Sequence, residues 1–191
     1  MNTLLRQPRI NPLTPPYRPG VETMLTKMMP PGFEVEPLKL FRVLAHHIDL
    51  ANRMRPLYAG ILAHGLVEDA ERELVILRTC ARCGAEYEWG VHAASFGKLL
   101  NTPDAKIWAT VTASAEDEIW TAREALLIRL ADELHDNATV SDALWNGLVL
   151  HWNEAQLIEL LMIAGLYHTI SFIVNGTSVS LESWGTRFPK L

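Results

Sequence analysis

Apolar positions recur with a helical period over most of this 191-residue chain. Leu40, Val43, Leu44 and His47 follow the i, i+3, i+4, i+7 spacing that places side chains on one face of a helix. No run of alternating apolar and polar residues bounded by turns competes with this period. The pattern therefore predicts an all-α domain of seven or eight helices, which we place at residues 37–191.

Prolines and capping residues set the expected helix boundaries. Pro56 is expected to separate two helices, the second at 57–64, and a third helix is expected at 68–82. Further starts are predicted where a capping side chain is followed by a proline, an acid or an amide: Thr102-Pro103-Asp104, Thr121 with Glu124, Thr139 with Asp142, and Asn153 with Gln156. The last of these opens an apolar helix that is expected to reach about Val174, with Asn175 as its C-cap.

The N-terminal segment differs in composition from the rest of the chain. Its first 37 residues contain eight of the eleven prolines. Because proline fixes φ and donates no backbone hydrogen bond, residues 1–36 are expected to form an extended arm with one short helix near 21–29. Such an arm could drape over the domain or over a neighbouring subunit.

Composition narrows the class of protein. Hydrophobic residues make up 49% of the chain and charged residues 20%, which argues against a disordered chain. A net charge of -5 supplies no basic face for nucleic acid, and two cysteines are too few for a disulfide scaffold. The N-terminus has no continuous apolar segment of the signal-peptide type, and the longest apolar stretch, 157–166, is too short to span a bilayer. We expect a soluble cytoplasmic protein with neither nucleic acid nor membrane as a partner.

Residues 72–92, RELVILRTCARCGAEYEWGVH, contain two competing candidate sites. Cys80 and Cys83 form a CxxC pair, which is compatible with a redox couple, a buried cluster or half of a zinc site. A structural zinc site needs four ligands, and no second CxxC or HxxxH follows, so no metal is expected. Both cysteines also precede Gly84, an expected helix stop, where the helix dipole raises thiol pKa values. Core packing is therefore favoured, and redox chemistry stays as the alternative.

The second candidate lies on the helix expected after Gly84. Glu88 and His92 are four residues apart and share one face of that helix. A carboxylate beside an imidazole can fix its tautomer, raise its pKa and relay a proton. An ordinary surface pair would have the same spacing. Trp89, between them, is expected to face the core.

Four segments of the chain resemble the carboxymuconolactone decarboxylase family, which includes the alkylhydroperoxidase D-like proteins. They lie within about residues 40–176 and read RELVILRT, CGAEYEWGVHAASFG, ADEL and ELLMIAGLYHTISFIVNG. The peroxidase branch of the family carries a glutamate, eleven residues and then CxxCxxxH. In that register Glu73 and His92 match, whereas Ala85 and Glu88 occupy the two cysteine positions. Both cysteines of this chain lie five residues too early, so the decarboxylase branch, which lacks the pair, is the closer resemblance.

The resemblance implies a helical fold and a homo-oligomer (dimer, trimer or hexamer) with a pocket shared between subunits. It also implies a small carboxylate or lactone as substrate, with no metal and no organic cofactor. In a lyase of this type, His92 would be the general acid or would bind the developing oxyanion. Glu88 would orient and charge it, and Glu73 would be a supporting or proton-relay group.

Other residues are weaker candidates. Tyr167 and His168, in the last expected helix, could line the pocket, and Arg72 could bind a substrate carboxylate. Core packing or surface charge is the alternative role for each. The same holds for further basic side chains: His46, His47, His64, Arg53, Arg55 and Arg78. Trp184 could form a subunit contact. Besides the lyase, a thiol peroxidase using the two cysteines and a non-catalytic binding oligomer remain open.

Overall fold

The computed structural model describes residues 7–29 and 36–190, and neither range contains a strand. Its helices in chain order are α1 (Val21–Met28), α2 (Lys39–Leu44), the short 3-10 helix η1 (Ala45–His47), α3 (Ile48–His64), α4 (Asp69–Arg82), α5 (Glu86–Leu99), α6 (Asp104–Thr112), α7 (Ala122–Asn137), α8 (Asp142–Leu148) and α9 (Glu154–Thr177). The predicted all-α class is confirmed, with eight α-helices in the described range 39–190.

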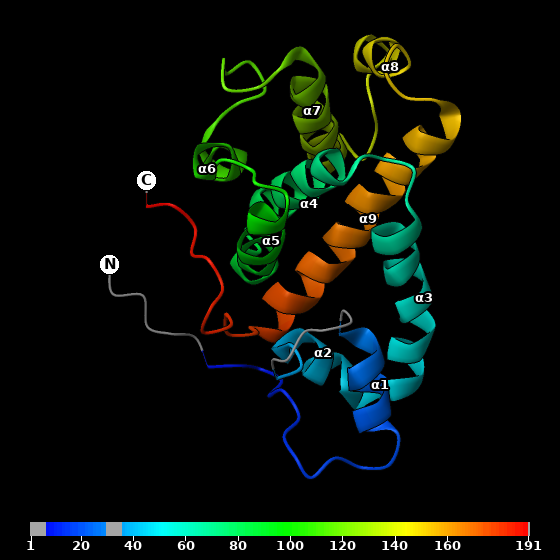
Figure 1. The fold of residues 1–191 in the computed structure, drawn as a ribbon, viewed down its shortest axis with the longest axis vertical. Coiled ribbons are helices and arrows are strands. Elements are labelled where there is room, and N and C mark those ends of the chain that lie inside the picture. Colours follow the sequence, from blue (N-terminus) through cyan, green and yellow to red (C-terminus); the bar gives the residue numbers. More distant parts are fainter. Residues whose placement is uncertain (1–6, 30–35, 191) are drawn as a thin grey trace.

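Helix α4 lies at the centre of the fold. It packs against α5, α6 and α7 on one side and against α9 on the other (Figure 1). Nine consecutive residues, 72–80, are buried, as expected for a helix that is covered on every side. Because this stretch includes the charged residues Arg72, Glu73 and Arg78, each of these needs a partner inside the protein.

The turn after α4 determines how α5 is placed. Gly84 has a left-handed φ of 62°, and the amides of Gly84 and Ala85 donate to the carbonyls of Ala81 and Cys80. These two hydrogen bonds form the Schellman motif, so Gly84 is the predicted C′ residue. The chain then reverses immediately into α5, which packs beside α4. The motif thereby brings the helix carrying Glu88 and His92 against the helix carrying Glu73.

The C-terminal tail covers the outer side of α5. The amide of Thr186 donates to the carbonyl of Gly90, and a β-carbon added at Gly90 would lie 2.2 Å from the carbonyl oxygen of Thr186. Only glycine allows this approach. Phe188 packs against Trp89, which is fully buried as predicted. The tail therefore fixes the back of the helix whose front carries His92.

The described part of the N-terminal arm contacts the body of the protein. The amide of Arg9 donates to the carbonyl of Thr177 at 2.9 Å, and that of Leu13 donates to the carbonyl of Arg42 at 3.2 Å. The short helix predicted near 21–29 is confirmed as α1, which builds a small separate core with η1 and the start of α3. The parts of the arm at 1–6 and 30–35 lie outside the described residues.

Several predicted boundaries were wrong. Pro56 does not separate two helices but lies inside α3. Asn52, whose carbonyl loses its helical partner, and Pro56 are both exposed, so water can hydrogen-bond the freed carbonyl. The chain changes direction earlier instead, at η1, where His47 caps α3.

Two predicted caps are shifted, and one C-cap is wrong. Pro103, not Thr102, precedes α6, because its carbonyl accepts the first helical hydrogen bonds. Ser141, not Thr139, caps α8 through its side chain. Asn175 lies within α9, which continues to Thr177, and its side-chain amide donates to the carbonyl of Cys83. The capping boxes predicted at the starts of α7 and α9 are confirmed.

Helix α9 has the length and hydropathy of a membrane span, with a mean hydropathy of 1.9 over its most apolar 18 residues. Half of that window is buried inside the domain. A core helix of a soluble protein has the same properties, and the neighbours of α9 are the helices α4 and α5. The other half of the helix exposes apolar side chains, including Ile158, Met162 and Phe172.

Candidate active site

Three of the predicted residues converge between α4 and α5. The Nδ1 atom of His92 lies 2.7 Å from Oε2 of Glu73, and its Nε2 atom lies 3.5 Å from Oε1 of Glu88. All three side chains are at least nine-tenths buried. We call Glu73, Glu88 and His92 the acid–base cluster. The geometry corrects one expectation: the short orienting hydrogen bond to His92 comes from Glu73, and Glu88 is the more distant carboxylate.

The environment of His92 favours its protonated form. Burial alone lowers the pKa of the ring, but the charge of Glu73, the hydrogen bond to Glu73 and the contacts with Glu88 outweigh burial and raise the pKa from 6.5 to about 9. A buried imidazolium between two carboxylates is therefore expected at neutral pH. Its Nδ1–H is held by Glu73, so the proton on Nε2 is the one that can be donated.

Arg72 neutralises the remaining negative charge. Its Nε lies 3.3 Å from Oε1 of Glu73, and Nη1 lies 2.6 Å from Oδ1 of Asp69. The guanidinium is thus engaged by carboxylates of the protein, and its predicted role as a binder of substrate carboxylate stays a prediction. The buried group thus contains two basic side chains, Arg72 and His92, and two acidic ones, Glu73 and Glu88. This pairing offsets the cost of placing four charges in the interior.

Two tyrosines border the acid–base cluster. Tyr167 of α9 is buried and places its ring edge-on to His92, with 5.1 Å between centroids, so its predicted place at the site is supported. Burial, and then Glu88 and Glu73, raise the pKa of Tyr167 well above its usual value. Tyr58 of α3 was not predicted. Burial and Glu88 raise its pKa too, and its buried hydroxyl has no hydrogen-bond partner among the described residues.

Cys80 lies next to the acid–base cluster. It is fully buried, and its thiol interacts with Ser171 of α9. Burial, and then the nearby charge of Glu88, raise the pKa of the Cys80 thiol well above its usual value, with Ser171 acting weakly in the opposite direction. A thiolate is the reactive form of cysteine, so this environment disfavours nucleophilic chemistry at Cys80.

The structure removes other candidates from this site. His168 follows Tyr167 on α9 but packs against His135 of α7 instead. Arg78 is buried in a bidentate pair with Asp132 and is structural. The remaining predicted histidines, His46, His47 and His64, are exposed. Trp184 is 39% exposed in the C-terminal tail.

Sequence reasoning missed Tyr58, Ser171 and His135. Tyr58 lies just after Pro56, where a separate short helix was predicted. Ser171 and His135 have no motif around them. Only the packing of α3, α7 and α9 on α4 and α5 brings these side chains to the two sites. Had the apolar period been traced through Pro56, Tyr58 would have been found on a long helix facing the domain.

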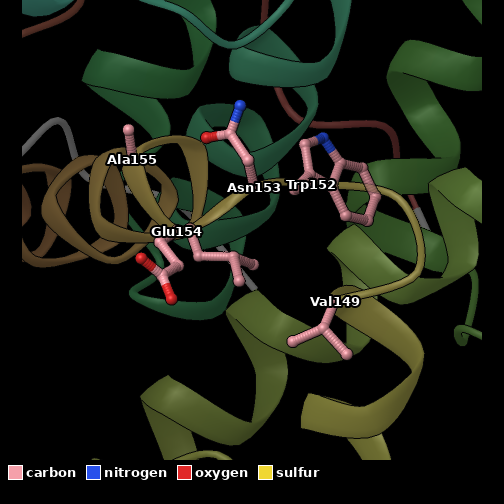
Figure 2. A pocket seen from close by; sticks show the side chains of 6 residues that line it. Val149, Trp152, Asn153, Glu154 and Ala155 are labelled. Atoms are coloured by element: carbon pink, nitrogen blue, oxygen red, sulfur yellow. The ribbon is translucent and has the colours of Figure 1, made fainter.

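Open surface pockets lie elsewhere. One is formed where α8 leads into α9 and is lined by Val149, Trp152, Asn153, Glu154, Ala155 and Leu157 (Figure 2). The side chain of Asn153 is engaged in the capping box of α9. A second pocket, at the α3–α4 connection, includes Asp69. Through Arg72, this second pocket is linked to the acid–base cluster.

Comparison with solved structures identifies the class of fold. The debrominase Bmp8, as a cysteine-to-alanine variant in complex with 2,3,4-tribromopyrrole, superposes with a TM-score of 0.70 at 17% identity, covering 96% of this chain and 94% of that one. A peroxidase-related protein from Silicibacter sp. TM1040 has a TM-score of 0.67 at 14% identity, covering 78% of each chain. An Agrobacterium tumefaciens protein of unknown function, proposed to be the antioxidant defence protein AhpD, has a TM-score of 0.67 at 16% identity, covering 73% of this chain and 94% of that one.

These likenesses give the chain the alkylhydroperoxidase D-like fold, as the sequence resemblance implied. A scan against protein-family models found no match, and a search of curated proteins by sequence found none either. At identities of this size the comparisons concern the fold alone. The chemistry has to be argued from the residues of this chain.

Proposed function

We propose that the protein is a cofactor-free lyase that acts by acid–base chemistry on a small carboxylated lactone or a related carboxylate, as carboxymuconolactone decarboxylases do. The observation that carries the proposal is the position of His92 between two buried carboxylates, with Glu73 fixing Nδ1 and with Nε2 directed toward Glu88. The absence of cysteine at positions 85 and 88 supports this branch of the fold over the peroxidase branch.

The proposed reaction follows from these positions. When a carboxylate leaves as CO₂, the electron pair of the broken C–C bond moves into an adjacent carbonyl and forms an enolate. The Nε2–H of His92 stabilises the developing oxyanion and then supplies the proton to carbon. Glu73 holds the ring and stabilises its charge throughout, because its Oε2 lies 2.7 Å from Nδ1 of His92. The donated proton stays in the product, so a proton from water must restore His92, and Glu88, 3.5 Å from Nε2, is placed to pass it on.

Tyr58 completes the proposed site. Its buried hydroxyl has no hydrogen-bond partner among the described residues, and such a group is stabilised when a bound molecule supplies the missing hydrogen bond. We propose that it donates to the substrate oxygen on which charge develops. Tyr167 would form the wall against which the substrate packs, because its ring already lies edge-on to His92.

The test is turnover of a panel of carboxylated five-membered lactones, with CO₂ and product followed by mass spectrometry. His92→Gln is expected to lower kcat/KM by about 10²–10⁴-fold with the fold intact by circular dichroism. His64→Gln, which changes an exposed histidine, is the matched control and is expected to keep full activity. Full activity of His92→Gln would end this assignment.

A homo-oligomer is part of the proposal. Exposed apolar side chains on α9 at helical spacing, Ile158, Met162 and Phe172, are 62%, 45% and 69% exposed, which is the kind of surface that subunit contacts cover. We propose that a second copy packs here and closes the substrate pocket. Analytical ultracentrifugation tests it: the wild type is expected to sediment as an oligomer, and Met162→Glu with Phe172→Glu as a monomer.

The second candidate is a thiol-dependent peroxidase using Cys80 and Cys83. Fold neighbours that are described as peroxidase-related favour it, and Cys83 is half-buried beside two histidines. The buried Cys80 with its raised pKa argues against it, since both thiols would have to react. Peroxide consumption coupled to a dithiol reductant separates the two functions. Activity that survives the Cys80→Ser, Cys83→Ser double change would dismiss the peroxidase.

A further inference from the structure

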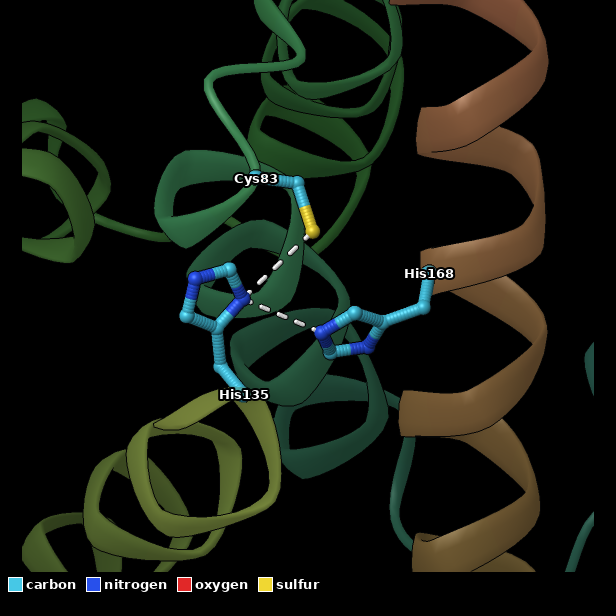
Figure 3. A group of neighbouring side chains, drawn as sticks. All are labelled: Cys83, His135 and His168. Atoms are coloured by element: carbon cyan, nitrogen blue, oxygen red, sulfur yellow. Dashed lines mark hydrogen bonds between the residues drawn. The ribbon is translucent and has the colours of Figure 1, made fainter. Parts of the chain in front are cut away.

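A second cluster of reactive side chains lies away from the acid–base cluster. Cys83 at the end of α4, His135 in the last turn of α7 and His168 in the middle of α9 point toward one another (Figure 3). The Sγ of Cys83 lies 3.7 Å from Nδ1 of His135, which lies 3.1 Å from Nε2 of His168. All three atoms lie within 4.8 Å of one another. We call these residues the thiol–imidazole cluster.

The spacing of these atoms matches the edges of a metal coordination tetrahedron. Zinc bonds of about 2.3 Å to sulfur and about 2.05 Å to nitrogen place neighbouring ligands about 3.4 Å apart for two nitrogens and about 3.6 Å apart for sulfur and nitrogen. The observed distances are 3.1 and 3.7 Å. A metal ion could therefore enter between the side chains with adjustments of a few tenths of an ångström at these two edges.

The histidine tautomers also suit a metal. Nδ1 of His168 lies 2.9 Å from the carbonyl oxygen of Ala164, which can only accept, so Nδ1 carries the hydrogen. The neutral ring then presents the lone pair of Nε2 to the cluster. A backbone carbonyl behind a histidine is the usual outer partner of a metal ligand, because it fixes the ring and increases its basicity. His135 presents Nδ1 to the same point.

The surroundings can accept a cation. The guanidinium of Arg82 lies near His135. Arg82 is paired with Asp132 and Asp136, which reduces its repulsion of a cation. The three ligand residues are half-buried, unlike the almost fully buried acid–base cluster. An ion can thus reach the site from solvent.

We propose that Cys83, His135 and His168 bind a divalent ion of the zinc class, with a fourth position open to water or an anion. One thiolate and two imidazoles form a donor set that such borderline-soft ions prefer. The set comes from three helices that α4 holds together, so it is preformed. No motif in the sequence indicates this set of ligands, because they are separated by 52 and 33 residues along the chain.

Cobalt titration of the protein tests the proposal directly. Tag-free protein is treated with a chelator, dialysed, and titrated with Co²⁺ under reducing conditions. We expect one Co²⁺ per chain, the visible ligand-field absorption of a tetrahedral ion, and near-ultraviolet charge transfer from thiolate to cobalt. Zn²⁺ is expected to abolish both absorptions by displacement. Failure of the wild-type protein to develop the charge-transfer absorption overturns the proposal.

Matched variants locate the ion. Cys83→Ser is expected to lose the charge-transfer absorption, and His135→Gln and His168→Gln are each expected to weaken binding by at least about 100-fold, since even outer partners of ligands contribute about 10–100-fold. Cys80→Ala and His64→Gln change a thiol and an imidazole outside the cluster and are expected to bind as the wild type does. Charge transfer that persists in Cys83→Ser would also overturn the proposal.

A second measurement does not depend on variants that fold. In wild-type protein, Zn²⁺ is expected to slow the alkylation of Cys83, followed by peptide mass spectrometry, in a saturable way. Unchanged alkylation at saturating Zn²⁺ contradicts the site. Because the acid–base cluster shares no residue with this one, loss of the ion is expected to leave lyase turnover at His92 intact, so the two proposals fail independently.

Discussion

The acid–base cluster on α4 and α5 and the thiol–imidazole cluster on α4, α7 and α9 both lie beside α9, but they differ in burial and charge. Tyr167 and His168 are adjacent on α9, yet Tyr167 packs against His92 and His168 packs against His135. The acid–base cluster is almost fully buried, and its charges are mutually paired with Arg72. The thiol–imidazole cluster is half-buried and contains no carboxylate.

This difference predicts that the first cluster supports the stability of the fold and that the second has atoms available to a ligand. In the acid–base cluster each charge depends on its neighbours, so the fold itself requires the arrangement. In the thiol–imidazole cluster the ligand atoms of Cys83, His135 and His168 point toward one another, and none of them belongs to an ion pair with a carboxylate. We therefore expect changes in the first cluster to destabilise the protein and changes in the second to alter ligand binding with little effect on folding.

The largest expected effect comes from Glu73→Ala. It leaves Arg72 and His92 buried without their shared carboxylate, which is expected to lower the free energy of unfolding by about 3–5 kcal/mol. Urea denaturation followed by circular dichroism measures it. Glu118→Ala, at an exposed position, is the control and is expected to stay within about 0.5 kcal/mol of wild type. Equal stabilities for the two variants would show that the buried pairing does not support the fold.

Stability is also expected to depend on pH through His92. Its pKa is about 9 in the folded protein against 6.5 for the free ring, so the folded state holds the proton more tightly. The stabilisation is complete below pH 6.5 and is lost as pH rises through 9, with a slope of at most about 1.4 kcal/mol per pH unit.

Unfolding free energies of wild type and His92→Gln, measured from pH 6 to 10, test this dependence. The variant lacks the titrating ring, so its curve is expected to be flatter between pH 6.5 and 9. Parallel curves for the two proteins would mean that the pKa of His92 is not raised. A wild-type stability that increases over this range would contradict the predicted direction.

Replacing either of two tyrosines by phenylalanine is expected to change the free energy of unfolding by a smaller amount. Tyr87 accepts a hydrogen bond from the amide of Leu40 and donates one to Glu182, so Tyr87→Phe is expected to cost about 1–3 kcal/mol of stability. Tyr58 has no such partners among the described residues, so Tyr58→Phe is expected to raise the free energy of unfolding, by about 1 kcal/mol, because it removes a buried polar group without a hydrogen bond.

Turnover should reverse the order of the two tyrosine variants. If Tyr58 donates to the substrate, Tyr58→Phe is expected to lower kcat by about 100-fold, the effect of removing one donor to a developing oxyanion. Tyr87→Phe is expected to leave kcat near the wild-type value once the protein is folded. A Tyr58→Phe enzyme with full activity would limit the hydroxyl to an unused group at the cluster.

Local features of the sequence predicted several helix boundaries and the helix face that carries Glu88 and His92. The capping boxes at α7 and α9 use hydrogen bonds between residues three positions apart, so the sequence contains all the required information. Gly84 likewise ends α4 and sets the register of α5, which places Glu88 and His92 on one face. The place of Glu73 near the site was implied by the family resemblance, but its short contact with His92 was not predicted.

The thiol–imidazole cluster could not be predicted in this way. His135 lies 52 residues after Cys83, and no spacing rule relates two side chains on separate helices. Their meeting depends on the crossing of α4 with α7, which is decided by packing over the whole core. The helix break predicted at Pro56 was wrong for a related reason. A local rule predicted the break, but that stretch of α3 is exposed to water, which can hydrogen-bond the carbonyl that the proline frees.

The smallest expected effect on stability concerns the two thiols. In metal-free protein, Cys83→Ser is expected to change the free energy of unfolding by less than about 1 kcal/mol, because the side chain is half-buried and a serine hydroxyl can keep hydrogen bonds with His135 and His168. Its reactivity separates it from Cys80. A thiol probe is expected to label Cys83 in the native protein and to label Cys80 only after urea unfolds the chain, since Cys80 is fully buried and its pKa is raised. Cys83→Ser should therefore be silent to the probe until it is denatured. Rapid labelling of Cys80 in that variant would contradict its burial, and a Cys80–Cys83 disulfide formed in the wild type by substoichiometric peroxide and reversed by a dithiol would favour the peroxidase over the lyase.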